Sequence, residues 1–182
     1  ISTDIIGFYE GTDDYFREAL LAKYDLEPSE LFLCAIHTHS APSPTINKER
    51  GHPNNVEYTE NLRDKLVEVV GQALDRTQPV EIGLGVGSCP VGVNRRELRI
   101  SKEGEPSIIL GRNAKGITDK EVLVMKVTGP DGAPLAVAFD YATHATSLGP
   151  KNYAISGDVI GLAEQFVEKV FGGDAIAPAF VG

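Results

Sequence analysis

The sequence has little positive charge, few sulfur-containing residues and no long apolar run. Its 17 Lys and Arg residues stand against 26 Asp and Glu, a formal net charge of -9, which argues against nucleic acid or an anionic membrane surface as a partner. The two cysteines, Cys34 and Cys89, lack the spacing of a metal site. No apolar stretch approaches the roughly 20 residues that a transmembrane helix needs. We therefore expect no nucleic-acid partner and no transmembrane segment.

The composition is that of a globular protein with enough chain to bury a core. Hydrophobic residues make up 42% of the 182 positions and charged residues 24%, which suits one domain. The chain opens at Ile1 and stops at Gly182 within segments that resemble strands. We expect residues 1–182 to form a single domain that is truncated at both ends.

Hydrophobic periodicity predicts a mixed α/β domain: a layered structure with a mixed parallel and antiparallel sheet covered by helices. Helices are expected near 12–24, 56–76 and 159–171. Strands are expected near 31–36, 80–88, 121–127, 133–141 and 176–181, with a short strand at the start of the chain. Pro130-Asp131-Gly132 is turn chemistry and predicts a hairpin across 121–141. Residues 97–120 read as irregular.

Two of the four histidines follow a continuous apolar run, 31–36, which predicts a strand buried on both faces. His37 and His39 are two residues apart, so on an extended chain they face the same side. His144 likewise follows an apolar run, 133–141. Imidazole nitrogens commonly bind zinc, although ordinary loop histidines are the alternative interpretation.

Several other residues allow both a structural and a functional interpretation. Asn94-Arg95 could hold a carboxylate or a carbonyl through the guanidinium donors, or form a surface ion pair. His52 lies in a long loop, 40–55. Ser156 or Asp158 is a natural N-cap for the last helix. Alternating glycines, at positions 83, 85 and 87, predict close packing of another element against that strand.

Four blocks of the sequence resemble the neutral/alkaline (non-lysosomal) ceramidase family, in matching order and over essentially the whole chain. They are His37-Thr-His39-Ser-Ala-Pro42, Val93-Asn94-Arg95, Tyr141-Ala-Thr-His144 continuing to Gly149 and Asn152, and Ile155-Ser-Gly-Asp158. Gly111-Arg112-Asn113 and the segment 119–122 further resemble bacterial members that were assigned by similarity. The chain would then be the N-terminal part of a ceramidase-like catalytic domain.

The resemblance implies a zinc-dependent amidohydrolase that cleaves the N-acyl bond of ceramide or a related lipid amide with a zinc-activated water. It implies that His37 and His144 are zinc ligands. His39 and Arg95 then lie beside the metal as catalytic residues, and Asn94 and Ser40 contact the substrate. It also implies a secreted or periplasmic protein, while the sequence itself leaves compartment and oligomeric state open.

The family pattern includes a glutamate and a tyrosine far downstream that complete the zinc site. The 182 residues lack that part, so we expect them to be inactive alone. Two alternatives stay open: a hydrolase of a different acyl amide or ester, and a non-catalytic binding domain that keeps the fold.

Overall fold

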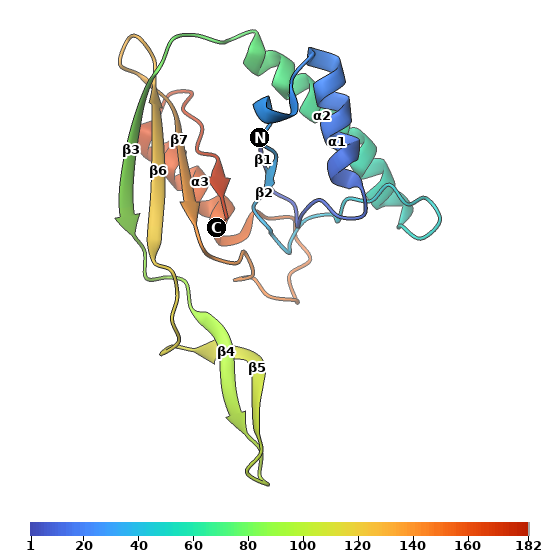
Figure 1. Cartoon of the computed structure of the whole chain (residues 1–182), viewed down its shortest axis with the longest axis vertical. Helices are drawn as coiled ribbons and strands as arrows, with labels where there is room; N and C mark the ends of the chain where they lie inside the picture. The colour runs from blue at the N-terminus through green and yellow to red at the C-terminus, as the bar shows by residue number, and fades with distance from the viewer. Residues whose placement is uncertain (182) are drawn as a thin grey trace.

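The computed structural model describes residues 1–181, and these contain three helices and several sheets (Figure 1). The largest sheet has the order β3 (Glu81–Ser88), β6 (Glu121–Thr128), β7 (Pro134–Tyr141) and β8 (Ala179–Phe180). Strands β3, β6 and β7 are antiparallel, whereas β7 and β8 are parallel. The mixed α/β fold predicted from the sequence is confirmed.

Two smaller sheets complete the strands. Strand β1 (Ser2–Thr3) pairs in parallel with β2 (Cys34–Ala35), and β4 (Asn94–Ile100) pairs in antiparallel with β5 (Pro106–Asn113). The hydroxyl of Ser2 donates to the Ala179 carbonyl at 2.7 Å, so β1 lies beside the outer edge of β8. The β4–β5 hairpin projects away from the other elements as a separate arm (Figure 1).

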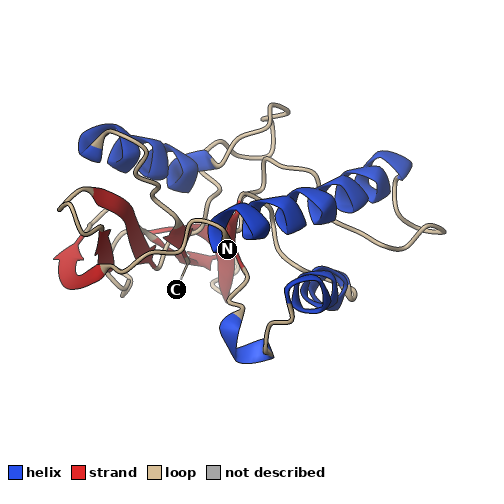
Figure 2. Ribbon diagram, turned by 90° about the horizontal axis from the view of Figure 1, so that it is seen from above, coloured by secondary structure: helices blue, strands red, loops and turns tan. Residues whose placement is uncertain are grey.

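Helix α3 lies against the main sheet, whereas α1 and α2 pack against each other on the other side of the β1–β2 pair (Figures 1 and 2). They are α1 (Thr12–Tyr24), α2 (Pro53–Leu74) and α3 (Asp158–Phe171), with a short 3₁₀ helix at Pro28–Glu30. All three α-helices were predicted, but α2 begins earlier than expected. Pro53 starts it because proline is tolerated in the first helical turn, where its missing N–H has no partner to lose.

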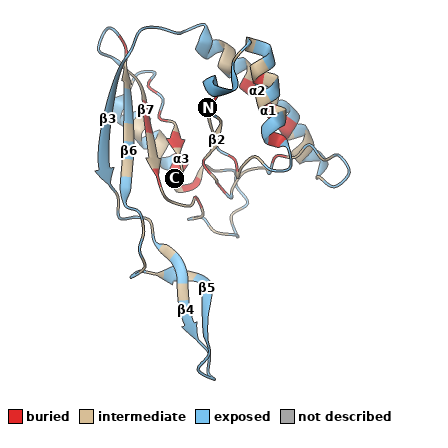
Figure 3. Cartoon of the chain, viewed as in Figure 1, coloured by how far each residue is buried: buried red, intermediate tan, exposed pale blue. Residues whose placement is uncertain are grey.

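Two buried clusters hold the domain together (Figure 3). One lies between α1 and α2 and contains Phe16, Leu20, Leu31 and Leu66. The other contains Ile36, Ala145, Ile160 and Ala179, and joins the end of β2, the loop after β7, helix α3 and strand β8. Ile36 and Ala145 are each 0% exposed, so the second cluster fixes the two chain segments that carry His37 and His144.

The predicted buried strand at 31–36 is wrong. Only Cys34 and Ala35 are in strand β2, and Phe32 is 65% exposed. The reason lies in the backbone partners, because the guanidinium of Arg17 binds the carbonyls of Pro28 and Leu31. Those carbonyls are therefore satisfied by a side chain instead of a neighbouring strand.

The interpretation of 97–120 as irregular is also wrong, because β4 and β5 form a hairpin there. Leu98 pairs with Ile108, and Ile100 pairs with Pro106. Gly104 supplies the positive φ, +88°, that the connecting turn needs. The available signal was the alternation of Leu98 and Ile100, followed by a glycine and by the apolar run 108–110.

Two smaller predictions were also corrected. In residues 1–181 nothing lies within 4 Å of the place where a Cβ would stand on Gly83 or Gly85, so these glycines do not accommodate a packed element. The last strand is shorter than predicted, because β8 covers Ala179–Phe180 and Ile176 forms an isolated bridge with Ala136.

Within the described residues, no helix has the length and hydropathy to cross a membrane.

Candidate metal centre

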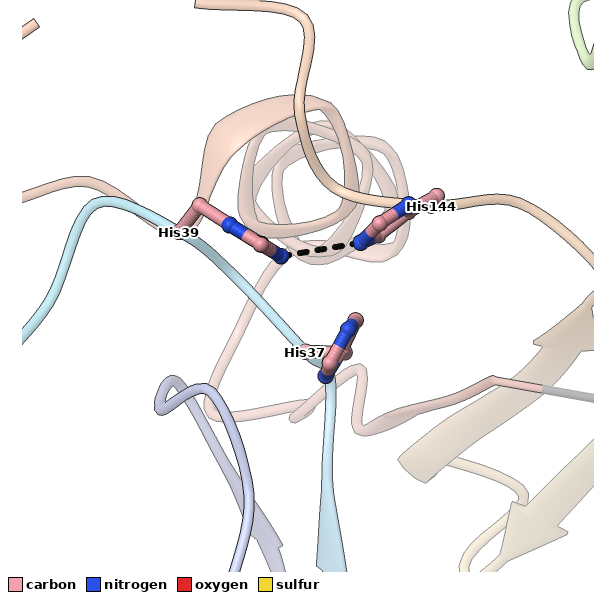
Figure 4. A group of neighbouring side chains, drawn as sticks. All are labelled: His37, His39 and His144. Carbon is pink, nitrogen blue, oxygen red and sulfur yellow. Dashed lines mark hydrogen bonds between the residues drawn. The ribbon is translucent and has the colours of Figure 1, made fainter. Parts of the chain in front are cut away.

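Three histidines from two chain segments converge at one end of the main sheet (Figure 4). His37 and His39 follow β2, and His144 comes three residues after the end of β7. The ring centroids are 4.7 Å apart for His37 and His144, and 4.8 Å apart for His39 and His144. Nitrogen atoms of the three rings all lie within 4.8 Å of one another. The described residues add no carboxylate or thiol to this group.

The route by which His37 and His39 meet differs from the predicted one. His37 has a φ of +60°, so the chain leaves the extended conformation at this residue and the strand periodicity does not apply. The two rings nevertheless lie 5.1 Å apart in an edge-to-face arrangement. A positive φ is costly for a residue with a side chain, and the buried neighbours Ile36 and Thr38 hold this one in place.

The His37 ring is oriented by a backbone carbonyl. Its Nδ1 lies 2.5 Å from the Ile6 oxygen, and a carbonyl can only accept, so Nδ1 carries the proton. That tautomer leaves the lone pair of Nε2 free. Metal-binding histidines commonly have this second contact, because it fixes both the tautomer and the ring orientation.

The His39 and His144 rings contact each other directly. Their Nε2 atoms are 2.9 Å apart, so one of these nitrogens donates a hydrogen bond and the other accepts it. Burial lowers the pKa of His144, the positive charge of Arg95 and the other two histidines lower it further, and Asp158 acts in the opposite direction. A lowered pKa keeps His144 neutral near pH 7, and neutral imidazole is the form that binds a metal.

The two histidine-bearing loops are joined by a set of hydrogen bonds. The His39 N–H donates to the Ala145 carbonyl at 3.3 Å, and the Ser156 N–H donates to the Ser40 carbonyl at 2.8 Å. The hydroxyl of Thr38, which is fully buried, donates to the Ser156 carbonyl at 2.7 Å. These bonds set the distance between the loops independently of any ligand.

Ser40 was predicted to contact substrate, and the structure gives its side chain a structural partner. The Asn152 amide donates to the Ser40 Oγ at 2.9 Å and to the Ala154 carbonyl at 2.7 Å. Asn152 thereby ties the loop after His39 to the loop after His144. A substrate role for Ser40 stays a prediction.

Asp158 holds the loop after His144, and neither of the two predicted N-caps, Ser156 and Asp158, is the N-cap of α3. Both nevertheless accept N–H groups at its start: the Ser156 Oγ accepts the Asp158 N–H at 3.0 Å, and the Asp158 carboxylate accepts the Val159 N–H at 2.6 Å. The Asp158 carboxylate also accepts the N–H groups of Ser147 and Leu148, both at 3.0 Å, while the N-cap of α3 is Gly157 without a side-chain bond. Burial alone would raise the pKa of Asp158, but the N–H groups of Leu148, Val159 and Ser147 outweigh it and lower the pKa. The carboxylate therefore stays ionised and keeps these bonds at neutral pH.

A cleft of about 1260 Å³ opens beside the histidines. Of the six predicted site residues, His37, Asn94, Arg95 and His144 line it, whereas His39 and Ser40 do not. Its wall on the hairpin side carries apolar residues: Val91, Val93, Ile108, Ile109 and Leu110. The cleft thus combines two of the imidazoles and the guanidinium groups of Arg95, Arg96 and Arg112 with apolar side chains.

Asn94 shapes the backbone around Arg95. Its amide donates to the Ile117 carbonyl at 2.9 Å, and its Oδ1 accepts the Arg96 N–H at 2.9 Å. The β4–β5 register shifts between Asn94 and Arg96, which is the kind of irregularity that re-aims a side chain. The Arg95 side chain makes no hydrogen bond or ion pair with the described residues, so the surface ion pair considered for it is absent from this part of the chain.

His52, the fourth histidine, lies away from this centre. It is the N-cap of α2, where its Nδ1 accepts the Asn54 N–H at 3.2 Å. Sequence reasoning missed the Ile6 carbonyl, which contacts His37, and the Tyr141 hydroxyl, which bonds to Cys89 and Gly92 before Arg95. A carbonyl has no sequence signal, because every residue has one. Tyr141 was part of the third motif but had been given no role.

A family profile described as "Neutral/alkaline non-lysosomal ceramidase, N-terminal" matches residues 4–182. This chain belongs to that family. The structure of the ceramidase-family chain thus brings together, at one site, residues from all of the motifs on which the resemblance was based.

Individual relatives agree with this membership. The chain is 29% identical over 164 residues to Neutral ceramidase 1 of Arabidopsis thaliana, covering 83% of this chain and 20% of that protein. The neutral ceramidase of Pseudomonas aeruginosa matches with a TM-score of 0.70 at 21% identity, over 98% of this chain and 29% of that one. A ceramidase complexed with C2 matches with a TM-score of 0.72 at 21% identity, over 98% and 28%.

The chain therefore spans between a fifth and a third of these ceramidases. The structural matches show that it shares their fold. The expected bacterial affinity stays a prediction, because a plant and a bacterial protein both match.

Proposed function

We propose that this chain forms half of the active site of a zinc-dependent amidase, which cleaves the N-acyl bond of ceramide or a related lipid amide. One observation carries the proposal: in a member of the ceramidase family, three imidazoles from two loops converge beside a cleft that also contains a guanidinium. The 182 residues alone are expected to be inactive, with the remaining ligands supplied by a longer chain.

The donor set suits zinc. Three imidazole nitrogens lie within 4.8 Å of one another, and we take two of them as ligands, one on a ring already oriented by a carbonyl. Such a pair suits a catalytic zinc site that completes its coordination with other groups. Bound zinc lowers the pKa of its water toward about 7 and polarises a carbonyl oxygen. His37 and His144 would hold the metal.

His39 and Arg95 would act on the substrate. An amide attacked by hydroxide develops a negative oxygen, and donors fixed beside that position stabilise it more than they stabilise the ground state. Arg95 lines the cleft and acts electrostatically on His144, so its positive charge is available to the developing oxyanion. His39 Nε2, 2.9 Å from that of His144, is the second candidate donor.

The cleft wall supports an acyl substrate. Ile108 and Leu110 line the cleft yet are 61% and 77% exposed, so an acyl chain lying there would bury apolar surface now in water. A related ceramidase fold has been described in complex with C2. Ceramide is therefore the substrate that we propose. Asn94 lines the same cleft and would contact this substrate.

The test measures hydrolysis by the full-length protein. It compares labelled ceramide, a simple N-acyl amide and an acyl ester, before chelation, after removal of zinc and after its return. We expect ceramide cleavage to disappear with zinc and to recover at one equivalent. Cleavage of only the ester or the simple amide would rule out ceramide as the substrate. If the full-length protein showed no hydrolysis and bound no stoichiometric zinc, the enzymatic proposal would be contradicted and a binding domain favoured.

A further inference from the structure

The segment that joins β3 to β4 has few backbone partners of its own. Residues 89–93 belong to no strand, and they lead directly to Asn94 and Arg95. The Cys89 N–H donates to the Lys120 carbonyl at 2.8 Å, and the next two bonds of the segment go to one side chain, Tyr141. The path of this segment therefore determines the position of the Arg95 backbone.

Tyr141 joins the two ends of this segment with a single hydroxyl group. The phenol donates to the Cys89 carbonyl at 2.8 Å and accepts the Gly92 N–H at 2.8 Å. Cys89 and Gly92 are three residues apart, the spacing at which a β-turn joins a carbonyl to an N–H directly. Here the hydroxyl bridges them instead, and Tyr141 is only 7% exposed.

Gly92 permits this close approach. A Cβ added at Gly92 would stand 3.0 Å from the Tyr141 Oη, which is tighter than ordinary van der Waals contact. The hydroxyl therefore lies directly against the backbone of the linker, and a side chain at this position would push the two apart.

Tyr141 is also the last residue of β7, three residues before His144. The same strand end thus carries a proposed zinc ligand and anchors the linker that leads to Arg95. The Arg95 side chain has no hydrogen bond to residues 1–181, so the course of its backbone sets its position relative to the histidines. Asn94 fixes that backbone on one side of the linker, and Tyr141 fixes it on the other.

We propose that Tyr141 is a positioning residue that holds the linker 89–93, and through it Arg95, in register with the histidines. The proposal rests on the function proposed above, because it gives Arg95 a role in the transition state. A guanidinium displaced by about 1 Å can cost up to roughly 100-fold in rate. Loss of the Tyr141 hydroxyl should therefore lower kcat and leave KM and zinc content nearly unchanged.

The experiment is a double-mutant cycle on the full-length protein with Tyr141→Phe, Arg95→Ala and the double variant. Tyr153→Phe is the matched control, because Tyr153 is 95% exposed. We expect Tyr141→Phe to reduce kcat about 10-fold to 100-fold, and to have little further effect when Arg95 is already Ala. Additive losses, or an unchanged kcat in Tyr141→Phe, would overturn the proposal.

A second readout separates this proposal from the proposed function. Amide hydrogen exchange of the linker needs no activity, and Tyr141→Phe should accelerate exchange at 91–95 while Tyr153→Phe should not. If the wild type hydrolyses nothing but the exchange result holds, the amidase proposal fails and the anchoring by Tyr141 stands. Unchanged exchange in Tyr141→Phe would overturn the anchoring itself.

Discussion

The loops that carry His37 and His144 are bound to each other, whereas the hairpin that carries Arg95 is bound mainly to itself. Between the histidine loops, backbone and side-chain hydrogen bonds connect residues 38–40 with residues 145–156. The β4–β5 arm projects from the domain and is largely exposed (Figures 1 and 3). Its anchors are the Tyr141 bridge and the Asn94 amide.

This difference separates two tasks of the proposed site. A metal needs ligands at fixed distances, so its loops are joined by buried bonds that exist without any ion. An acyl substrate needs a wall that can adjust, and a two-stranded hairpin is only marginally stable by itself. Changes that break the bonds between the two histidine loops should therefore cost stability and metal together, and changes on the arm should cost rate alone.

The largest expected stability effect comes from breaking the connection between the loops. Thr38→Val keeps the shape of a fully buried side chain but leaves the Ser156 carbonyl and the Ser40 N–H without their partner. We expect the free energy of unfolding to fall by about 1–3 kcal/mol, measured by urea denaturation.

The matched change on the arm is Ser107→Ala, which removes an exposed bond of 3.4 Å to the Arg99 carbonyl. We expect this variant to stay within about 0.5 kcal/mol of the wild type. Equal losses in the two variants would break the comparison, because the arm would then be as firmly held as the histidine loops.

A smaller effect on stability should come from Glu164 of α3, whose carboxylate accepts the Ala179 N–H. Burial raises its pKa to about 7, partly offset by the Ala179 N–H and reinforced by Asp4 and Glu168. The folded state then keeps a proton that the unfolded chain loses above about 4.5. Stability should fall as the pH rises from about 4.5 through 7.

Glu164→Gln removes this ionisation and keeps an oxygen for the Ala179 N–H. We expect the variant to be more stable than the wild type at pH 8 and nearly equal at pH 5, by urea denaturation. Glu103→Gln, an exposed change at the tip of the β4–β5 hairpin, is the control because Glu103 does not act on Glu164. A wild type whose stability does not change between these pH values would refute the assignment.

Sequence reasoning found the histidine side better than the arm. The helices, the 121–141 hairpin and the pair His37 and His144 followed from periodicity and from histidines after apolar runs. The positive φ of His37 and the carbonyl of Ile6 could not be predicted, because neither depends on a residue type. The arm was missed although Leu98, Ile100 and Ile108 alternate, since the surrounding glycines indicated irregular chain.

Resemblance to the family supplied what the residues alone left open. On chemistry alone, a surface ion pair was the favoured interpretation of Arg95, and only the resemblance to the family placed it near the metal. Asp158 shows the converse: its motif was noticed, but the cap role that its sequence position suggested belongs to Gly157. Its contacts with Ser147 and Leu148 depend on tertiary packing.

The zinc content of single histidine variants of the full-length protein tests the central claim most directly. We predict that His37→Ala and His144→Ala lose zinc and activity together. His39→Ala should retain one equivalent of zinc while its rate falls about 10²–10³-fold. Stoichiometric zinc in the His144→Ala protein would contradict the account, because the two loops would then not share a metal.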